Sequence, residues 1–215
     1  MKILLIGANG RMGTQMQRYM TNKNIDFFAV DKQNFEQANK EQFDVIVDFS
    51  SPQALEQNLQ LAKAKKKPIL IACTNHDKNN LKLMKLASKN IAIALCPNLS
   101  VGVMAFAKMI ECMAAVKDYD FVLTEIHHKQ KKDAASGTAK QIIYKLDKLN
   151  IHPETFAVRA GSIVGEHSLV AFGENEVVEI KHTALSRNCF CEGAIKVCEK
   201  LTNSPAGFYS IEELL

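Results

Sequence analysis

Short apolar runs alternate with segments of helical periodicity through the first hundred residues of the chain. The apolar runs lie at residues 2–6, 25–30, 44–49, 68–73 and 91–96, and helices are expected at 11–20, 52–66 and 80–88. Continuous apolar runs separated by helices are typical of parallel strands that are buried on both faces. The pattern therefore predicts an α/β domain built on a Rossmann-type, doubly wound parallel sheet.

The pattern changes after residue 100. Strand-like runs at 121–127, 155–161, 167–172 and 176–185 accompany helices expected at 102–116 and 138–149. Only short turns separate the last three runs, which favours an α+β domain with a partly antiparallel, mixed sheet. A last helix at 191–201 and the tail at 206–215 could pack against the first domain, and the pattern alone leaves this open. We place the domain boundaries at 1–100, 101–187 and 188–215.

Composition excludes several classes of protein. The chain carries 27 basic and 23 acidic residues, interspersed, for a net charge of +4. Nucleic-acid binders usually show a basic stripe, so we expect a small anionic ligand and no nucleic acid. The apolar run before Gly7 is too short for a signal peptide and no run reaches membrane-spanning length, so we expect a cytoplasmic protein with no membrane partner. Six cysteines without disulfide-scaffold density or CxxC spacing indicate reduced thiols and no metal site.

A glycine-rich turn, GANGRMG, follows the first strand and opens the first helix. Gly7 permits the tight turn, Gly10 lets a pyrophosphate approach the backbone, and Gly13 allows close packing of the helix. The second strand ends at Asp31, 18 residues after Gly13, where a carboxylate can accept hydrogen bonds from ribose hydroxyls. We therefore predict a nicotinamide dinucleotide site, with a nucleotide-free strand-turn-helix as the alternative. Asp31 favours NADH, although Lys32 beside it could pair with the 2′-phosphate of NADPH.

The ends of three later strands supply further candidates, because ligands of open α/β sheets lie beyond the carboxyl ends of the strands. These ends are DFSSP at 48–52, ACTNHD at 72–77 and CPNLSVG at 96–102. The nicotinamide is expected near the last two. Asn, Ser, Thr and Pro are also ordinary loop and cap residues, so each position alone has a purely structural explanation.

A second cluster, HHKQKKDAASGTA at 127–139, combines two adjacent histidines and three lysines with a Ser-Gly-Thr turn that precedes a helix. The backbone N–H groups of such a turn can bind a carboxylate. A hydride acceptor that carries carboxylates also needs a proton donor, and histidine can supply a proton near neutral pH. Adjacent side chains of an extended chain point to opposite faces, so His127 and His128 should have different roles, and a shared metal is disfavoured. The alternative is a solvated lysine-rich loop with a capped helix.

Together these segments resemble the 4-hydroxy-tetrahydrodipicolinate reductase family, also called the dihydrodipicolinate reductase family. The resemblance runs nearly from end to end, through IGANGRMG, VDFSSP, CPNLSVGV, EIHHKQKKDAASGTA, the stretch from His182 to Phe190, and AGFYSIEELL. It implies a nucleotide-binding domain completed by the C-terminal tail, and a central substrate domain whose sheet builds a homotetramer. It also implies reduction of a small cyclic dicarboxylate by NADH or NADPH in diaminopimelate and lysine biosynthesis.

By position, the resemblance implies that His127 is the general acid and Lys131 a second proton-donating residue. It places His128, Gly137 and Thr138 at the substrate carboxylates. The residues implied to hold the dinucleotide are Gly7, Ala8, Asn9, Gly10, Arg11, Met12, Asp31, Lys32, Ala72, Cys73, Thr74, Pro97, Asn98, Leu99 and Ser100.

The chain departs from the family pattern in two places that bear on function. Residues 72–75 read Ala-Cys-Thr-Asn where the family has Gly-Thr-Thr-Gly. Only 17 residues separate Asp31 from Asp48, so the segment that follows the second strand in the family is largely missing, which leaves the presence of a helix there open. The altered loop motivates two alternatives to the reductase: a dinucleotide-binding sensor or inactive relative, and another small dehydrogenase that acts on a different carboxylate. A sensor would have no use for both His127 and Lys131.

Overall fold

The computed structural model describes all 215 residues, which divide into two compact units. The first unit joins Met1–Leu99 to Phe190–Leu215, and the second is Ser100–Cys189. The first and last segments of the chain therefore fold into one unit, and the second unit is an insertion between them in the sequence.

The first unit is built on a six-stranded sheet in the order β10-β5-β4-β3-β1-β2, in which every pair of neighbours is parallel. Its strands are β1 (Ile3–Ile6), β2 (Phe27–Val30), β3 (Val45–Asp48), β4 (Ile69–Ile71), β5 (Ala92–Leu95) and β10 (Gly207–Tyr209). Its helices are α1 (Arg11–Asn22), α2 (Leu55–Lys65), α3 (Lys78–Ala87), α6 (Asn188–Leu201) and α7 (Ile211–Leu214). Short 3-10 helices η1 (Phe35–Asn39) and η2 (Pro52–Ala54) complete it.

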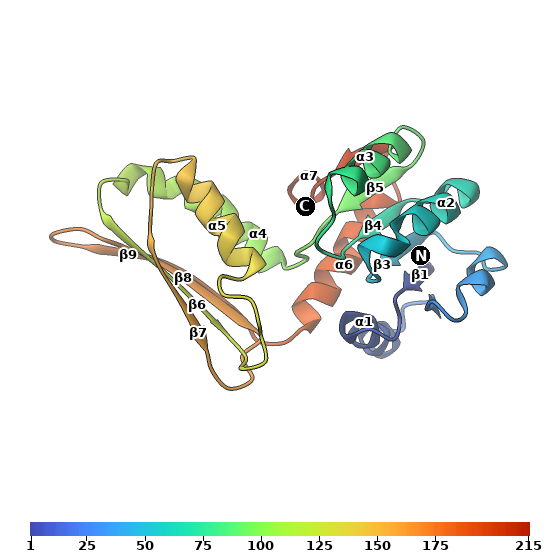
Figure 1. Ribbon diagram of the computed structural model, residues 1–215, viewed down its shortest axis with the longest axis horizontal. Coiled ribbons are helices and arrows are strands. Elements are labelled where there is room, and N and C mark those ends of the chain that lie inside the picture. Colours follow the sequence, from blue (N-terminus) through green and yellow to red (C-terminus); the bar gives the residue numbers. More distant parts are fainter. The chain divides into compact units, whose positions relative to one another are not determined.

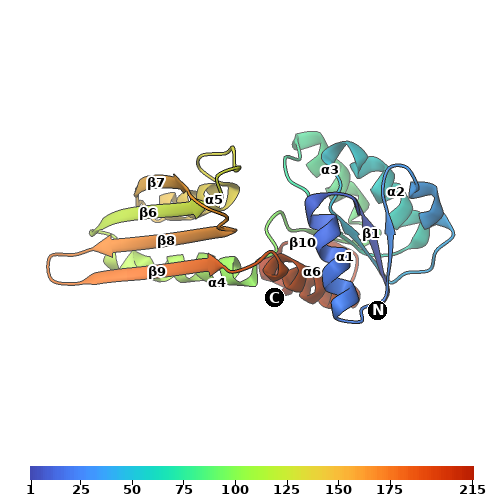
Figure 2. The same cartoon turned by 90° about the horizontal axis from the view of Figure 1, so that it is seen from below.

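Helices cover both faces of this sheet, with α1 and α6 on one face and α2 and α3 on the other (Figures 1 and 2). Strands β1, β3 and β4 are buried at every position, as their continuous apolar sequence requires. The predicted doubly wound parallel sheet is confirmed. Strand β10 pairs with β5, which answers the question that the sequence pattern left open: the C-terminal tail adds the edge strand of the first sheet.

The segment after β2 differs from the helical crossovers of the rest of the unit. The five-residue 3-10 helix η1 stands between β2 and β3. Its single buried residue, Ala38, packs into the core cluster that Val30 and Phe43 also join. The short chain between Asp31 and Asp48 therefore forms only this short 3-10 helix, and the order of the strands in the sheet is kept.

The second unit packs two helices on one face of a four-stranded mixed sheet, in the order β7-β6-β8-β9 (Figures 1 and 2). Strands β6 (Asp120–His127) and β7 (Glu154–Arg159) are parallel, whereas β8 (Gly165–Phe172) and β9 (Val177–Ala184) run antiparallel to their neighbours. Helix α4 (Val101–Met109) continues into the 3-10 helix η3 (Ile110–Val116), and α5 is Gly137–Asp147. The expected mixed sheet is confirmed, and the helix expected at 102–116 is α-helical only in its first half.

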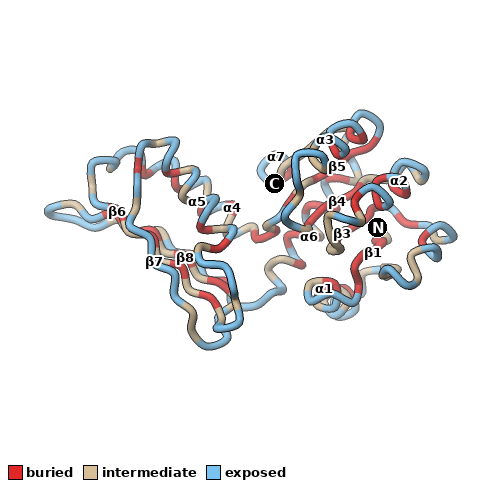
Figure 3. The backbone as a smooth tube through the Cα atoms, in the orientation of Figure 1, coloured by how far each residue is buried: buried red, intermediate tan, exposed pale blue.

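The two faces of this sheet differ in burial. In β6 the burial alternates strictly, so that Phe121, Leu123, Glu125 and His127 face the helices and the intervening side chains face away. The covered face packs Phe121 and Leu123 of β6 against helical side chains that include Phe106 of α4 and Ile142 of α5. The other face has no helix over it, and β7 is exposed along nearly its whole length (Figure 3).

None of the helices combines the length and the apolar character that crossing a bilayer requires.

Candidate active site

The glycine turn connects β1 to α1 through close backbone contacts. Gly7 has a φ of +82°, a left-handed conformation that glycine adopts without strain, and its N–H donates to the carbonyl of Val30 at 3.0 Å. A Cβ at Gly13 would lie 2.1 Å from the carbonyl oxygen of Gly7, so glycine is required there for α1 to approach the turn. Gly10 is the N-cap of α1 and offers no side-chain cap. The N–H groups of the first turn therefore face outward beside a backbone that carries no side chain, as an anion site needs.

Asp31 lies directly after β2, next to this turn. One carboxylate oxygen accepts the backbone N–H of Asn9 at 2.8 Å, and the other accepts the N–H of Lys32 at 2.6 Å. The carboxylate thus stabilises the glycine turn at Asn9 from the neighbouring strand. Each oxygen keeps a further lone pair, so these bonds are compatible with a role in accepting ribose hydroxyls.

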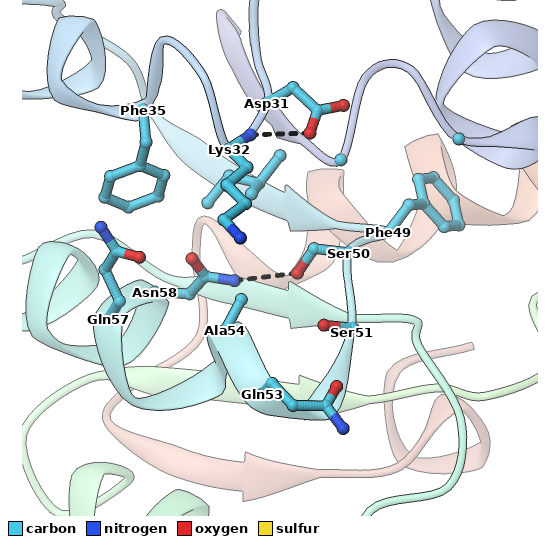
Figure 4. Close-up of a pocket in the computed structure, with 13 residues that line it drawn as sticks. Asp31, Lys32, Phe35, Phe49, Ser50, Ser51, Gln53, Ala54, Gln57 and Asn58 are labelled. Carbon is cyan, nitrogen blue, oxygen red and sulfur yellow. Dashed lines mark hydrogen bonds between the residues drawn. The ribbon is translucent and has the colours of Figure 1, made fainter.

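A cavity of about 520 Å³ opens beside these residues at the carboxyl end of the sheet. The sequence-predicted residues that line it are Gly7, Gly10, Asp31 and Lys32. The ammonium group of Lys32 points across it toward Ser50 and Asn58 (Figure 4). The remaining lining residues are Ile6, Phe35, Phe49, Ser50, Ser51, Gln53, Ala54, Gln57 and Asn58. The structure therefore brings the first two predicted segments together with the strand end at 48–52, and with Phe35, Gln57 and Asn58, which the sequence analysis missed.

The wall of this cavity is fixed by a buried carboxylate. Asp48 ends β3 and accepts the N–H and hydroxyl of Ser50 and the side-chain amide of Asn58, the last at 2.8 Å. Burial raises the pKa of Asp48, and the hydrogen bonds from Ser50 and Asn58 oppose that rise. The carboxylate consequently holds the loop after β3 and the helix α2 in register with each other.

The other predicted strand ends lie outside this cavity. Ala72, Cys73 and Thr74 follow β4, and Pro97, Asn98 and Leu99 follow β5, but none of them is among its lining residues. The Cys73 sulfur lies 3.2 Å from Nε2 of His76, and burial raises the pKa of the Cys73 thiol to about 12, with the charge of Asp48 adding to the rise. Cys73 is therefore a protonated, unreactive thiol at neutral pH.

In the second unit, His127 is the last residue of β6 and lies on the covered face of the sheet. Its Nε2 edge rests on the backbone of Gly165, where a Cβ would come within 3.1 Å of that nitrogen. Its Nδ1 lies 3.6 Å from a carboxylate oxygen of Glu125, two residues earlier on the same face. Burial lowers the pKa of His127, the charge of Glu125 opposes this, and the charges of Lys131, Arg159 and His128 add to the lowering.

Glu125 is the centre of the polar cluster around His127. Its side chain is fully buried, and both carboxylate oxygens accept the backbone N–H of Ser136, at 3.1 and 3.0 Å. Arg159, from β7, donates to it at 2.9 Å and also donates to the backbone carbonyl of Asp133. Burial alone would raise the pKa of Glu125, but the hydrogen bonds from Ser136 and Arg159 outweigh it and lower that pKa. The carboxylate is thus ionised.

His167 completes the cluster from β8, where it pairs with Glu125 across the strands. Its Nε2 lies 3.2 Å from the Ser136 hydroxyl oxygen and 3.8 Å from Glu125, and burial lowers its pKa to about 4. Ser136 is the N-cap of α5, and its hydroxyl accepts the N–H of Ala139 at 3.1 Å. The start of α5 is therefore attached to the sheet through Ser136, by Glu125 at the backbone and by His167 at the side chain.

The loop between β6 and α5 carries the other predicted substrate residues. Lys131 donates from its backbone to the carbonyl of His128 at 3.1 Å, and its ammonium lies 3.5 Å from Asp133. Gly137 is exposed, with open space where a Cβ would project, and Thr138 follows it in the first turn of α5. Of the two adjacent histidines, His127 lies against the Glu125 carboxylate. That the two have different roles stays a prediction.

Ligand atoms of Glu125, His127 and His167 lie within 4.8 Å of one another, which is close enough to surround a cation. The carboxylate already has a cationic partner in Arg159, and both of its oxygens accept hydrogen bonds from protein groups. We therefore assign no metal to this cluster.

Comparison with known proteins decides the family. A family model described as "Dihydrodipicolinate reductase, N-terminus" matches residues 1–99, and one described as "Dihydrodipicolinate reductase, C-terminus" matches residues 102–215. The chain belongs to the dihydrodipicolinate reductase family.

Relatives named 4-hydroxy-tetrahydrodipicolinate reductase align with the whole chain. The protein of Bdellovibrio bacteriovorus is 32% identical over 219 residues, which cover 100% of this chain and 96% of the relative. That of Thermosipho africanus is 33% identical over 218 residues, which cover 100% and 98%. The fold matches a dipicolinate-bound dihydrodipicolinate reductase from Paenisporosarcina sp. TG-14 with a TM-score of 0.78 and 16% identity, covering 100% of this chain and 99% of that chain. Membership in the dihydrodipicolinate reductase family makes the chain an NAD(P)H-dependent oxidoreductase.

Glu125, Arg159 and His167 are not among the site residues predicted from the sequence. The period of two in β6 would have placed Glu125 beside His127, because residues two apart in a strand share a face. The contacts of Arg159 and His167 depend on strand pairing between β6, β7 and β8, for which the sequence offers no local signal.

Proposed function

We propose that this chain reduces 4-hydroxy-tetrahydrodipicolinate to tetrahydrodipicolinate with NADH or NADPH, in diaminopimelate and lysine biosynthesis. The observation that carries the proposal is the arrangement around Glu125. Within a single unit, the ionised Glu125 carboxylate contacts both the buried His127 and the backbone N–H of Ser136, the N-cap of α5. A proton donor beside an anion-binding helix start is what the reduction of a carboxylate-bearing substrate requires.

The first unit would hold the dinucleotide. The uncapped start of α1 at Gly10 suits a pyrophosphate, and Asp31 at the cavity wall suits a ribose. The further residues of this site are Ala8, Asn9, Arg11, Met12, Ala72, Cys73, Thr74, Pro97, Asn98, Leu99 and Ser100, as family membership implies. When bound, the nicotinamide supplies hydride. Asp31 favours NADH, while the proximity of Lys32 to the same cavity leaves NADPH usable.

The second unit would hold the substrate. His128, Gly137 and Thr138 bind its carboxylates, with the N–H groups at the start of α5 as donors. His127 gives a proton to the substrate atom that becomes electron-rich after reduction, and Lys131 is the second proton-donating group. The lysine charge also compensates the charges of the dicarboxylate. Burial of His127 keeps water from competing for its proton.

The proposed domain roles follow the same division. Residues 1–100 bind the dinucleotide, 101–187 bind substrate and form the tetramer, and 188–215 return to the first domain. The open face of the second sheet supports a homotetramer, because it exposes apolar side chains that a soluble monomer rarely gathers on one sheet. They include Phe156 and Val158 on β7, Phe172 on β8 and Val177 on β9. The substrate and cofactor are those of cytoplasmic biosynthesis, and we place the protein there.

The proposal is tested with purified protein, NADH and freshly generated product of the preceding synthase. Substrate-dependent oxidation of NADH is expected. His127→Ala and Lys131→Ala should each lower turnover by about 10²-fold or more, the usual scale of general acid catalysis, with little change in NADH affinity. Lys132→Ala, an exposed lysine of the same loop, is the matched control and should retain full turnover.

Three outcomes would contradict the proposal or part of it. NADH binding without turnover in the unmodified protein would favour the sensor or inactive relative, a reading motivated by the altered loop at 72–75. Turnover of other carboxylates but not of the dicarboxylate would favour another small dehydrogenase. A loss of NADH affinity in His127→Ala would refute the division of roles between the two units.

A further inference from the structure

Buried ionisable groups on the covered face of the second sheet converge on one carboxylate. Glu125 accepts hydrogen bonds from two distant segments: the backbone N–H of Ser136 at both of its oxygens, and the guanidinium of Arg159. Its remaining neighbours are imidazoles, His127 at 3.6 Å and His167 at 3.8 Å. A fully buried carboxylate so completely held has no freedom to change its position, and it can therefore orient what lies against it.

The protons of the cluster can be assigned from its contacts. The Nδ1 of His167 is buried with no partner, which indicates that its proton is on Nε2, directed at the Ser136 hydroxyl oxygen. That oxygen also accepts the N–H of Ala139, so its own proton is left to donate to Glu125. The cluster thereby presents to His127 a carboxylate with no proton of its own.

The charges around His127 come from every neighbouring element. Glu125 is the single anionic group against it, whereas the charges of Arg159 from β7, and of Lys131 and His128 from the following loop, lower the pKa of His127. His167 from β8 contacts the His127 ring edge to face, with centroids 5.3 Å apart, and is neutral at pH 7 because burial lowers its pKa to about 4. Without Glu125, burial and these cations would lower the pKa of His127 further, with no anionic group to oppose them.

We propose that Glu125 is a positioning residue for His127: its buried carboxylate, fixed by Ser136 and Arg159, orients the imidazole, stabilises its protonated form, and links it to the N-terminus of α5. The inference rests on the proposed role of His127 as general acid. It explains why an acidic side chain occupies a core position of β6, where an unpaired charge would be strongly unfavourable. The same carboxylate also contacts both the proposed proton donor and the start of α5, where the substrate carboxylates are expected to bind.

The test replaces Glu125 by Gln, which keeps the shape and removes the charge. The titration of His127 is followed by NMR of ¹³C-labelled histidine, with its signal assigned from a His127→Gln variant. In Glu125→Gln the titration should move to lower pH by about one pH unit or more, the scale of losing an opposite charge within about 4 Å. The alkaline limb of kcat/KM should move in the same direction, and kcat should fall more than tenfold.

Two further variants separate positioning from structure. Glu179→Gln makes the same change on β9, on the opposite face of the same sheet, and should leave the titration and the alkaline limb in place. Glu125→Asp keeps the negative charge but moves the carboxylate away from His127, because the Asp side chain is one methylene shorter. The alkaline limb of kcat/KM should therefore stay near its normal pH, while kcat should fall about tenfold because the imidazole is no longer held in place. If Glu125→Gln does not fold, the Asp variant decides, and an unchanged kcat there overturns the inference.

An unchanged His127 titration in folded Glu125→Gln would also overturn it. The NMR experiment needs no substrate, so it is independent of the proposed reaction. If the unmodified protein turned over no dicarboxylate, the proposed function would fail, while a shifted titration would still establish the coupling of Glu125 to His127.

Discussion

Two glycines of the β1–α1 turn should respond differently to substitution by alanine. Replacing Gly13 should lower stability, whereas replacing Gly10 should lower dinucleotide affinity. A Cβ at Gly13 would lie 2.1 Å from the Gly7 carbonyl oxygen and 2.8 Å from that of Ala8, and both atoms belong to the backbone. Reaching an ordinary contact of 3.4 Å would require α1 to retreat by about 1.3 Å. Overpacking of this kind costs about 1–3 kcal/mol, and we expect the upper end because no flexible side chain can move aside. At roughly 2–4 °C per kcal/mol, Gly13→Ala should lower Tm by about 6–12 °C.

Gly10→Ala is the matched comparison. Its Cβ would lie 3.3 Å from the Gly7 carbonyl oxygen, and its φ of −70° suits any residue. We expect a loss of about 1 kcal/mol or less in stability, but a clear loss of dinucleotide affinity because the new methyl group covers the path of the pyrophosphate.

Thermal unfolding by circular dichroism measures the stability difference between the two variants. The rise in NADH fluorescence on binding measures the affinity of each variant for the dinucleotide. A Gly13→Ala protein that melts within about 2 °C of the unmodified one would refute the steric argument. A Gly10→Ala protein with normal NADH affinity would refute the assignment of the pyrophosphate to this turn.

Three further outcomes are expected. Asp31→Ala should raise the KM for NADH more than that for NADPH, since it removes the expected ribose acceptor, and an unchanged ratio in steady-state kinetics would contradict this. Phe156→Lys should shift sedimentation toward smaller species, because it places a charge on the open sheet face that is proposed to form the tetramer. Leu86→Lys is the control and should leave sedimentation unchanged: Leu86 is similarly exposed (60% against 52% for Phe156) but lies in α3 of the other unit. The free energy of unfolding should fall as pH drops from 6.5 toward about 4, by up to about 1.4 kcal/mol per pH unit. The reason is that His167 binds a proton in the unfolded chain but not in the folded one. In urea unfolding at several pH values, His167→Gln should make this slope smaller.

The sequence predicts most of the fold because burial on two faces and burial on one face leave different patterns. Continuous apolar runs such as residues 3–6, separated by helical segments, are typical of interior strands of a parallel sheet, whereas strand-like runs joined by short turns are typical of a partly antiparallel sheet. The 3-10 helix η1 was not predictable in the same way. Its five residues are too few to show a period, and their conformation follows from the short distance that the chain must span between β2 and β3.

The site was predicted where its residues are neighbours in the sequence and missed where strand pairing assembles it. The glycine turn, the histidine pair and the Ser-Gly-Thr turn are local signals, and each lies at the end of a strand or at the start of a helix. Arg159 reaches Glu125 from β7, and His167 reaches it from β8, across 34 and 42 residues of chain. Glu125 also lies outside the lysine-rich loop, and because its charge is buried, it interacts more strongly with its neighbours than the exposed charges of that loop do.

The second unit uses the same device at both of its α-helices. Ser136, the N-cap of α5, lies 3.2 Å from Nε2 of His167, and Ser100, the N-cap of α4, lies 3.4 Å from Nε2 of His182. His167 and His182 are paired across β8 and β9 and face the same side of the sheet. Burial lowers the pKa of each, so both remain neutral and can meet a cap hydroxyl without bringing a charge to the positive end of a helix. Two neutral histidines of the second unit thus contact the N-caps of its α-helices. The buried carboxylate of this unit, Glu125, lies against the third histidine, His127, and interacts with its charge.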